Sequence, residues 1–161
     1  MQPYLKALAT CGLEAHALKL PRGSAERAMA PLREQVEALP RSVIGGHSFG
    51  GRVASLVSAE TPPAGLVLLS YPLHRPGHPE DLRTEHWPEI DCPVLLLSGD
   101  RDQFARVDLL REAVPRLPRA ELHIYPGLRH GLTSVAEDVA QRIAAFVDGL
   151  AHPGPSTRSR R

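Results

Sequence analysis

The sequence predicts an α/β fold in which a mostly parallel sheet is covered by helices on both faces. Short apolar segments rich in Val, Leu and Ile alternate with segments of helical periodicity along the 161 residues. Two of these segments, residues 65–70 and 93–98, are apolar at nearly every position, as is typical of parallel strands buried on both faces. Strands and helices that alternate at this spacing form βαβ units with right-handed crossovers.

The strand candidates follow one another at intervals that leave room for helices. Four are strong, namely residues 41–46, 65–70, 93–98 and 120–125. Residues 13–20 are a weaker fifth candidate, because polar side chains are interleaved with the apolar ones.

The helix candidates occupy most of the remaining chain. Residues 3–11 resemble the end of a helix that Gly12 stops, and Ser24 is suited to cap a helix that runs to Leu39 and closes at Pro40. Three further helices are predicted over residues 49–59, 106–117 and 134–150. The segment from Tyr71 to Asp91 is rich in proline and histidine, and we expect it to be a long loop across one end of the sheet.

Composition excludes several classes of function. The net charge is +1, from 19 basic and 18 acidic residues, so no concentrated basic surface for nucleic acid or an anionic membrane is expected. We find no signal peptide and no apolar run of the roughly 20 residues that span a bilayer. Cys11 and Cys92 are predicted to be reduced thiols in a cytoplasmic protein. We expect one domain over residues 1–150 and a disordered basic tail over residues 151–161.

Residues 46–51 read Gly-His-Ser-Phe-Gly-Gly and contain the pattern G-x-S-x-G between a predicted strand and a predicted helix. A serine at such a turn adopts a strained backbone conformation, and we expect Gly46 and Gly50 to relieve the crowding around it. Ser48 is then exposed at the top of the sheet, and the backbone N–H of Phe49 points to where an oxyanion would form. The alternative is a glycine-rich turn that carries a solvated serine.

A serine nucleophile needs a base and an acid, and in this arrangement they follow in the order Ser, Asp or Glu, His. Asp102 follows the strand candidate at 93–98, and His130 follows the one at 120–125. Both would lie at the carboxyl ends of parallel strands, where ligand sites gather. We predict acyl transfer in which Ser48 attacks a carbonyl, His130 moves the proton and Asp102 orients the imidazole. Asp100 is the alternative acid, although it is better suited to form the turn.

The other histidines have simpler explanations. We expect His47 to project away from the nucleophile and to have a packing role. His74, His78 and His86 are too irregularly spaced to predict a metal site, and a solvated lip is favoured. His74 and Phe104 are the candidates for the lip of the substrate site. No metal, nucleotide or flavin motif is present, so no cofactor is implied, and the expected partner is a small-molecule acyl substrate.

The serine, acid and histidine segments together resemble the α/β-hydrolase superfamily over roughly residues 3–150. That resemblance implies a three-layer fold and a serine hydrolase. A narrower likeness is carried by Leu69-Ser70-Tyr71-Pro72-Leu73-His74, by Leu82-Arg83 and by residues 93–99. These resemble a small branch without a large cap, related to dienelactone hydrolases. The branch includes the hydrolase-like domain of a regulatory subunit of the chromatin NSL acetyltransferase complex, a testis-expressed relative and many bacterial proteins.

The chain departs from the superfamily pattern at its N-terminus. Against that pattern the first three strands and the loop with the second oxyanion donor are missing, so we expect an incomplete N-terminus. Residues 13–20 and 41–46 would then be the fourth and fifth strands. Loss of the third strand would leave a gap between them unless these two strands close up. Loss of one oxyanion donor typically lowers the rate by about 10²–10³.

The leading hypothesis is a serine hydrolase that cleaves a small ester, thioester or related acyl substrate. The alternatives are a non-catalytic hydrolase-like module that binds a protein partner and a truncated, inactive fragment, since fold alone does not determine function.

Overall fold

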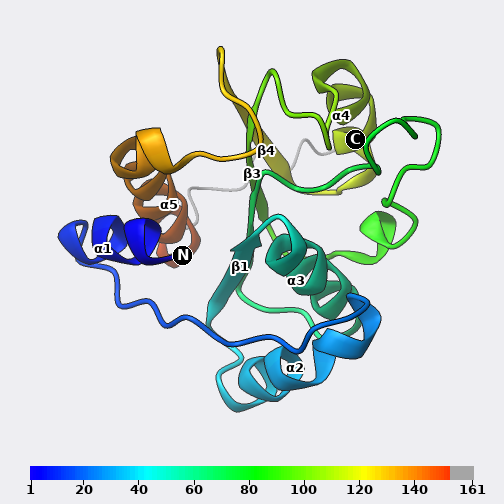
Figure 1. Cartoon of the computed structure of the whole chain (residues 1–161). Coiled ribbons are helices and arrows are strands. Elements are labelled where there is room, and N and C mark those ends of the chain that lie inside the picture. Colours follow the sequence, from blue (N-terminus) through cyan, green and yellow to red (C-terminus); the bar gives the residue numbers. More distant parts are fainter. Residues whose placement is uncertain (153–161) are drawn as a thin grey trace, which may run out of the picture.

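Four parallel strands form one sheet in a computed structural model that describes residues 1–152 (Figure 1). The strands are β1 (Val43–His47), β2 (Gly65–Leu69), β3 (Val94–Gly99) and β4 (Ala120–Tyr125), and they are paired in that order. The structure therefore confirms the four strong strand candidates, to within two residues at each end.

Five helices occupy the segments in which helices were predicted. They are α1 (Gln2–Thr10), α2 (Met29–Ala38), α3 (Phe49–Glu60), α4 (Val107–Ala113) and α5 (Ala136–Ala151). Three are extended by 3₁₀ turns, namely η1 (Glu26–Ala28) before α2, η3 (Val114–Arg116) after α4 and η4 (Thr133–Val135) before α5. Ser24 lies at the predicted start of the second helix, and its Oγ accepts the N–H of Arg27 at 3.4 Å. Gly12 follows α1 with a positive φ of 76°, a conformation that favours glycine.

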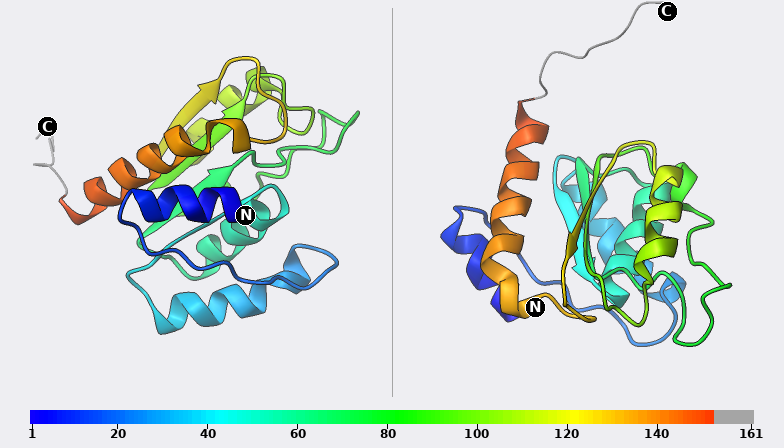
Figure 2. Two further views of the ribbon diagram at one scale, coloured as in Figure 1. Left: turned by 60° about the vertical axis from the view of Figure 1, so that its left-hand side comes forward. Right: turned by 90° about the horizontal axis from the view of Figure 1, so that it is seen from above.

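The helices cover the sheet in two layers (Figure 2). Alternate strand residues face opposite sides, so that Leu66 and Leu96 belong to the core beneath α2, α3 and α4. Val67 and Leu95 belong to a second core beneath α1 and α5. All four side chains are buried. This arrangement confirms the three-layer fold class, and it explains why the middle strands are apolar at nearly every position.

Residues 13–20 do not form a strand, so that prediction was wrong. Their alternating pattern is typical of a strand with one buried face. However, every residue from Glu14 to Lys19 is exposed, including Leu18 at 42%. With neither face buried, the segment runs as a loop between α1 and η1. The expected gap inside the sheet is therefore absent, and within residues 1–152 β1 pairs with β2 alone and leaves its other side as an edge.

The segment from Tyr71 to Asp91 crosses one end of the sheet as predicted, and it is anchored in the core. It contains the 3₁₀ turn η2 (Trp87–Glu89). Tyr71 and Trp87 are both buried, and their ring centroids are 5.2 Å apart. The segment therefore provides a fixed wall beside the carboxyl ends of the strands.

The predicted basic tail falls almost wholly outside the described residues, since Ala151 ends α5 and residues 153–161 are not described. Among residues 1–152, no helix has both the length and the apolar composition required to cross a membrane.

Candidate active site

Ser48 occupies the sharp turn between β1 and α3. Its φ of 52° and ψ of −115° lie in a region that non-glycine residues rarely adopt. The turn is held on both sides, because the Ser48 N–H donates to the Leu69 carbonyl at 2.9 Å and the Ser48 carbonyl accepts the Arg52 N–H at 3.0 Å. A strained residue persists only where its surroundings determine its conformation, and such positions cluster at functional sites.

The glycines of the turn have different roles. A Cβ atom on Gly46 would lie 2.4 Å from the Gly50 carbonyl carbon and 2.7 Å from the Gly51 nitrogen. A Cβ on Gly51 would lie 2.8 Å from the Gly46 carbonyl oxygen, whereas a Cβ on Gly50 would meet nothing within 4 Å. The prediction for Gly46 is confirmed, but the one for Gly50 was wrong. The second crowded position is Gly51, because a Cβ atom there would point toward β1. A Cβ atom on Gly50 would point into open space.

The structure brings the three predicted residues together through hydrogen bonds. His130 Nε2 lies 2.7 Å from Ser48 Oγ, and His130 Nδ1 lies 2.8 and 2.9 Å from the two oxygens of Asp102. A carboxylate only accepts, so Nδ1 carries the proton and Nε2 is free to accept the Ser48 hydroxyl. The Asp102 side chain is fully buried, while 18% of the His130 side chain is exposed.

Asp100 has a different position from Asp102. It is exposed, and its Oδ1 accepts the backbone N–H of Gly127 at 2.7 Å. Asp100 therefore stabilises the turn that leads from β4 to His130, whereas Asp102 contacts His130 itself. Asp102 Oδ1 also accepts the N–H of Phe104 at 2.8 Å, which fixes the carboxylate in the loop after β3.

Two rings pack against the His130 imidazole. The Phe104 ring lies 4.3 Å from it between centroids, and the His47 ring lies 5.2 Å away. The expected packing role of His47 is confirmed by this contact with His130. The His47 ring also stacks on Tyr4 of α1 at 6.3 Å, and the Tyr4 hydroxyl accepts the Leu132 N–H at 3.1 Å. No sequence pattern pointed to Tyr4, because it is 128 positions from Leu132.

Burial lowers the pKa of His47, and the neighbouring His130 lowers it further. The Nε2 atom of His47 is buried, and it has no hydrogen-bond partner in the described part of the chain. The lowered pKa favours the neutral form of His47, which avoids a positive charge beside the His130 ring.

Phe49 begins α3, and its backbone N–H forms no hydrogen bond within the described residues. The first N–H groups of a helix have no partner within that helix, and they carry its positive dipole end. The N–H of Phe49, directly after Ser48, is therefore free to donate to an oxyanion.

His74 is not at the lip of the site, so that prediction was wrong. It is 2% exposed, its Nδ1 donates to the Arg75 carbonyl at 2.9 Å, and its Nε2 accepts the Arg106 N–H at 3.2 Å. The backbone N–H of His74 donates to the Phe104 carbonyl at 3.0 Å. His74 therefore joins the long loop to the segment that carries Phe104, since both of its ring nitrogens are occupied.

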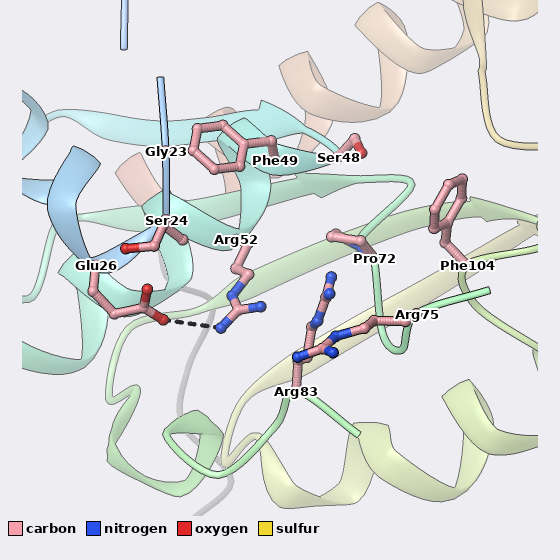
Figure 3. Close-up of a pocket in the computed structure, with 11 residues that line it drawn as sticks. Gly23, Ser24, Glu26, Ser48, Phe49, Arg52, Pro72, Arg75, Arg83 and Phe104 are labelled. Carbon is pink, nitrogen blue, oxygen red and sulfur yellow. Dashed lines mark hydrogen bonds and ion pairs between the residues drawn. The ribbon is translucent and has the colours of Figure 1, made fainter. Parts of the chain in front are cut away.

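A pocket of about 530 Å³ opens beside Ser48 (Figure 3). Phe49, Pro72 and Phe104 line its apolar part, and Phe104 is one of the two candidates for the lip of the substrate site. The polar lining includes Glu26 and three arginines, at positions 52, 75 and 83. These arginines were not among the residues predicted for the site. Arg52 follows Ser48 by four residues, so helical spacing alone would have placed it on the same side of α3.

Cys92 does not compete as the nucleophile. Cys92 is buried, and burial raises the pKa of its thiol to about 11. Such a thiol is protonated at neutral pH and therefore unreactive.

Comparison with known families and proteins agrees with this fold. A family model described as an alpha/beta hydrolase domain matches residues 16–147. A non-heme haloperoxidase of Rhodococcus erythropolis is 37% identical over 71 residues, which are 43% of this chain and 24% of that protein. A non-heme chloroperoxidase of Kitasatospora aureofaciens is 38% identical over 56 residues, 34% of this chain and 20% of that one. The matched region spans about a quarter of these relatives or less.

Solved structures resemble the fold over most of the chain. An esterase from Pyrococcus furiosus has a TM-score of 0.79 at 16% identity, covering 94% of this chain and 75% of that one. A monoacylglycerol lipase from Paleococcus ferrophilus has a TM-score of 0.77 at 15% identity, covering 91% and 88%. At this level of identity the likeness establishes a common fold.

The two elbow glycines give a matched test of the crowding. Gly46→Ala is expected to lower the free energy of unfolding by about 1–3 kcal/mol, because the new methyl group must displace backbone. Gly50→Ala is expected to be neutral or slightly stabilising, because its methyl group enters open space and alanine favours the helix. Urea denaturation of both variants measures the difference. Equal losses in both would contradict this account of the turn.

The stability of the chain is expected to fall on acidification. Because the folded pKa of His47 lies below the ordinary value of about 6.5, its contribution is complete above that pH and is lost as the pH falls toward the folded pKa. Urea denaturation at pH 7.5 and 5.5 measures the loss. His47→Phe is expected to reduce it without abolishing it, since burial also lowers the pKa of His86. An unchanged pH dependence in the variant would show that His47 does not contribute.

Proposed function

The chain belongs to the alpha/beta hydrolase domain family, and we propose that it is a serine hydrolase that cleaves a small ester, thioester or related acyl substrate. The observation that carries the proposal is the continuous hydrogen-bond chain from Ser48 Oγ through His130 to Asp102. This chain lies at one end of a pocket that can hold a small molecule. The two matched relatives and the two similar structures are named as enzymes, which is consistent with the proposal.

The proposed reaction begins when Ser48 Oγ attacks the substrate carbonyl carbon and passes its proton to His130 Nε2. The positive charge that develops on the imidazole is stabilised by the buried Asp102 carboxylate, which accepts from Nδ1. The negative charge that develops on the carbonyl oxygen is stabilised by the Phe49 N–H and the positive end of α3. His130 then donates its proton to the leaving alcohol or thiol, and the acyl group stays on Ser48.

A water molecule completes the cycle by the same route. His130 accepts a proton from the water as its oxygen attacks the acyl carbon, and the Ser48–acyl bond breaks with return of the proton to Oγ. Preorganisation supports this reaction, because Phe104 and His47 pack on the imidazole and Asp102 is held by the N–H of Phe104. The groups that move protons are therefore already positioned before a substrate binds.

Within the family, we further propose the branch related to dienelactone hydrolases, on the strength of the segment from Leu69 to His74. Tyr71, Leu73 and His74 of this segment are buried, and the Tyr71 hydroxyl donates to the Arg83 carbonyl at 2.6 Å. Of this segment, Pro72 lines the pocket.

The nucleophile is tested by labelling the purified chain with a fluorophosphonate probe, which reacts only with an activated serine. Labelling and hydrolysis of 4-nitrophenyl butanoate are expected in the wild type, and both are expected to be lost in Ser48→Ala, with hydrolysis reduced by at least about 10³-fold. Circular dichroism is expected to show an unchanged fold. A folded wild type that neither labels nor hydrolyses the ester would favour the non-catalytic module.

The acid is tested by a matched pair of variants. Asp102→Asn is expected to lower kcat/KM for the same ester by about 10²–10⁴, because an amide cannot orient the imidazole or balance its charge. Asp100→Asn is expected to retain kcat/KM within a few-fold, since Asp100 contacts the turn at Gly127 and does not contact His130. A reversed result, with only Asp100→Asn inactive, would overturn the assignment.

A further inference from the structure

The pocket beside Ser48 contains more positive charge than its own carboxylate balances. Arg52, Arg75 and Arg83 all line it, and Glu26 is the one acidic side chain in the lining. Figure 3 shows the three guanidinium groups pointing into the same space below Phe49 and Pro72. Glu26 binds Arg52 at 2.9 Å. The pocket lining therefore has a net charge of +2.

The side chains of the other two arginines have no partner among the described residues. Within residues 1–152, neither Arg75 nor Arg83 forms a side-chain hydrogen bond or an ion pair. Burial lowers the pKa of the Arg83 guanidinium, and the positive charges of Arg52 and Arg75 lower it further. The cluster is thus electrostatically unfavourable when the pocket holds no anion, and a bound anion would relieve it.

The backbones that carry these arginines are held in place by hydrogen bonds. Arg83 donates its N–H to the Leu73 carbonyl at 2.8 Å and accepts the Tyr71 hydroxyl at 2.6 Å. The Arg75 carbonyl accepts both the His74 ring at 2.9 Å and the His78 N–H at 3.0 Å. A recognition site benefits from such preorganisation, because less entropy is lost when the ligand binds.

Arg52 belongs to α3, the helix that follows Ser48, and it also lines the pocket. Its Nε is buried and has no hydrogen-bond partner in the part of the chain described. A buried donor without a partner is costly, and an anion in the pocket would be a suitable acceptor. Guanidinium groups bind carboxylate and phosphate oxygens with paired, charge-assisted hydrogen bonds.

From this arrangement we infer that the preferred substrate is an ester or thioester that also carries an anionic group, a carboxylate or a phosphate, bound by Arg75 and Arg83. The inference rests on the proposed function and specifies its substrate class. The apolar part of the pocket, at Phe49, Pro72 and Phe104, is nearest Ser48 and would hold the carbon skeleton beside the reacting carbonyl. The anion would lie at the arginine end (Figure 3).

The test compares anionic esters with their own neutral methyl esters. Mono-4-nitrophenyl adipate has a carboxylate on the acyl side, and 4-butanoyloxy-3-nitrobenzoate has one on the leaving group. At least one of the two is expected to have a kcat/KM about tenfold or more above that of its methyl ester. Which of them is preferred shows whether the arginines bind the acyl part or the leaving group. The preference is expected to weaken in high salt.

Variants assign the effect to the arginines. Arg75→Gln and Arg83→Gln are each expected to lower the preference severalfold, and the double variant is expected to abolish it while hydrolysis of the neutral methyl esters is largely retained. Arg111→Gln is the control, because Arg111 is exposed on α4 and outside the pocket. Glu26→Gln is expected to increase the preference, because it releases Arg52 from its ion pair.

Equal kcat/KM values for each anionic and neutral pair would overturn the inference and leave the proposed hydrolase function intact. So would a preference that survives in the double variant. If no ester is hydrolysed at all, calorimetric titration with glutarate and with inorganic phosphate decides the matter. Binding of either anion that is lost in the double variant supports the anion site independently of catalysis, whereas no binding of either anion overturns it.

Discussion

The close approach of β1 to the start of α3 is the constraint on which the site depends. Gly46 and Gly51 face each other across this contact with no room for a methyl group on either. The chain can therefore leave the strand and enter the helix through one residue, Ser48, whose backbone adopts a strained conformation. The strain is offset by the hydrogen bonds of Ser48 to Leu69 and Arg52. As a result, the hydroxyl of Ser48 and the N–H of Phe49 are held at the same end of the sheet.

The remaining parts of the site reach Ser48 because the sheet is parallel. The carboxyl ends of β1, β3 and β4 all lie at the same end of the sheet. The loops that follow these strands carry Ser48, Asp102 and His130. Each loop is also tied to a neighbour, for example through the hydrogen bond between Asp100 and Gly127. The imidazole is then packed between Phe104 and His47, which restricts its orientation.

The pocket divides into an apolar part beside the nucleophile and a cationic part beyond it. Phe49 and Phe104 line the first, and Arg75 and Arg83 line the second. This division is what a hydrolase needs if it recognises a substrate by a charged group remote from the bond that breaks. Binding energy from a remote group can be used to position the carbonyl against the nucleophile. In the proposed function, the long loop from Tyr71 to Asp91 contributes both Arg75 and Arg83 to the anion-binding part of the pocket.

The sequence by itself was enough to predict the layered fold, its four strands, and the placement of Ser48, Asp102 and His130 directly after three of those strands. Those features depend on local periodicity and on chain order, both of which can be read along the chain. It did not determine that residues 13–20 remain a loop, because their alternating pattern is local whereas the burial that a strand needs is not. Only the tertiary structure packs the His47 ring against those of Tyr4 and His130, and only the tertiary structure buries His74. It also brings Arg52, Arg75 and Arg83 to the lining of one pocket. The physical reason is that these contacts join segments distant in sequence, and their free energies depend on burial and mutual charge that only the folded chain creates.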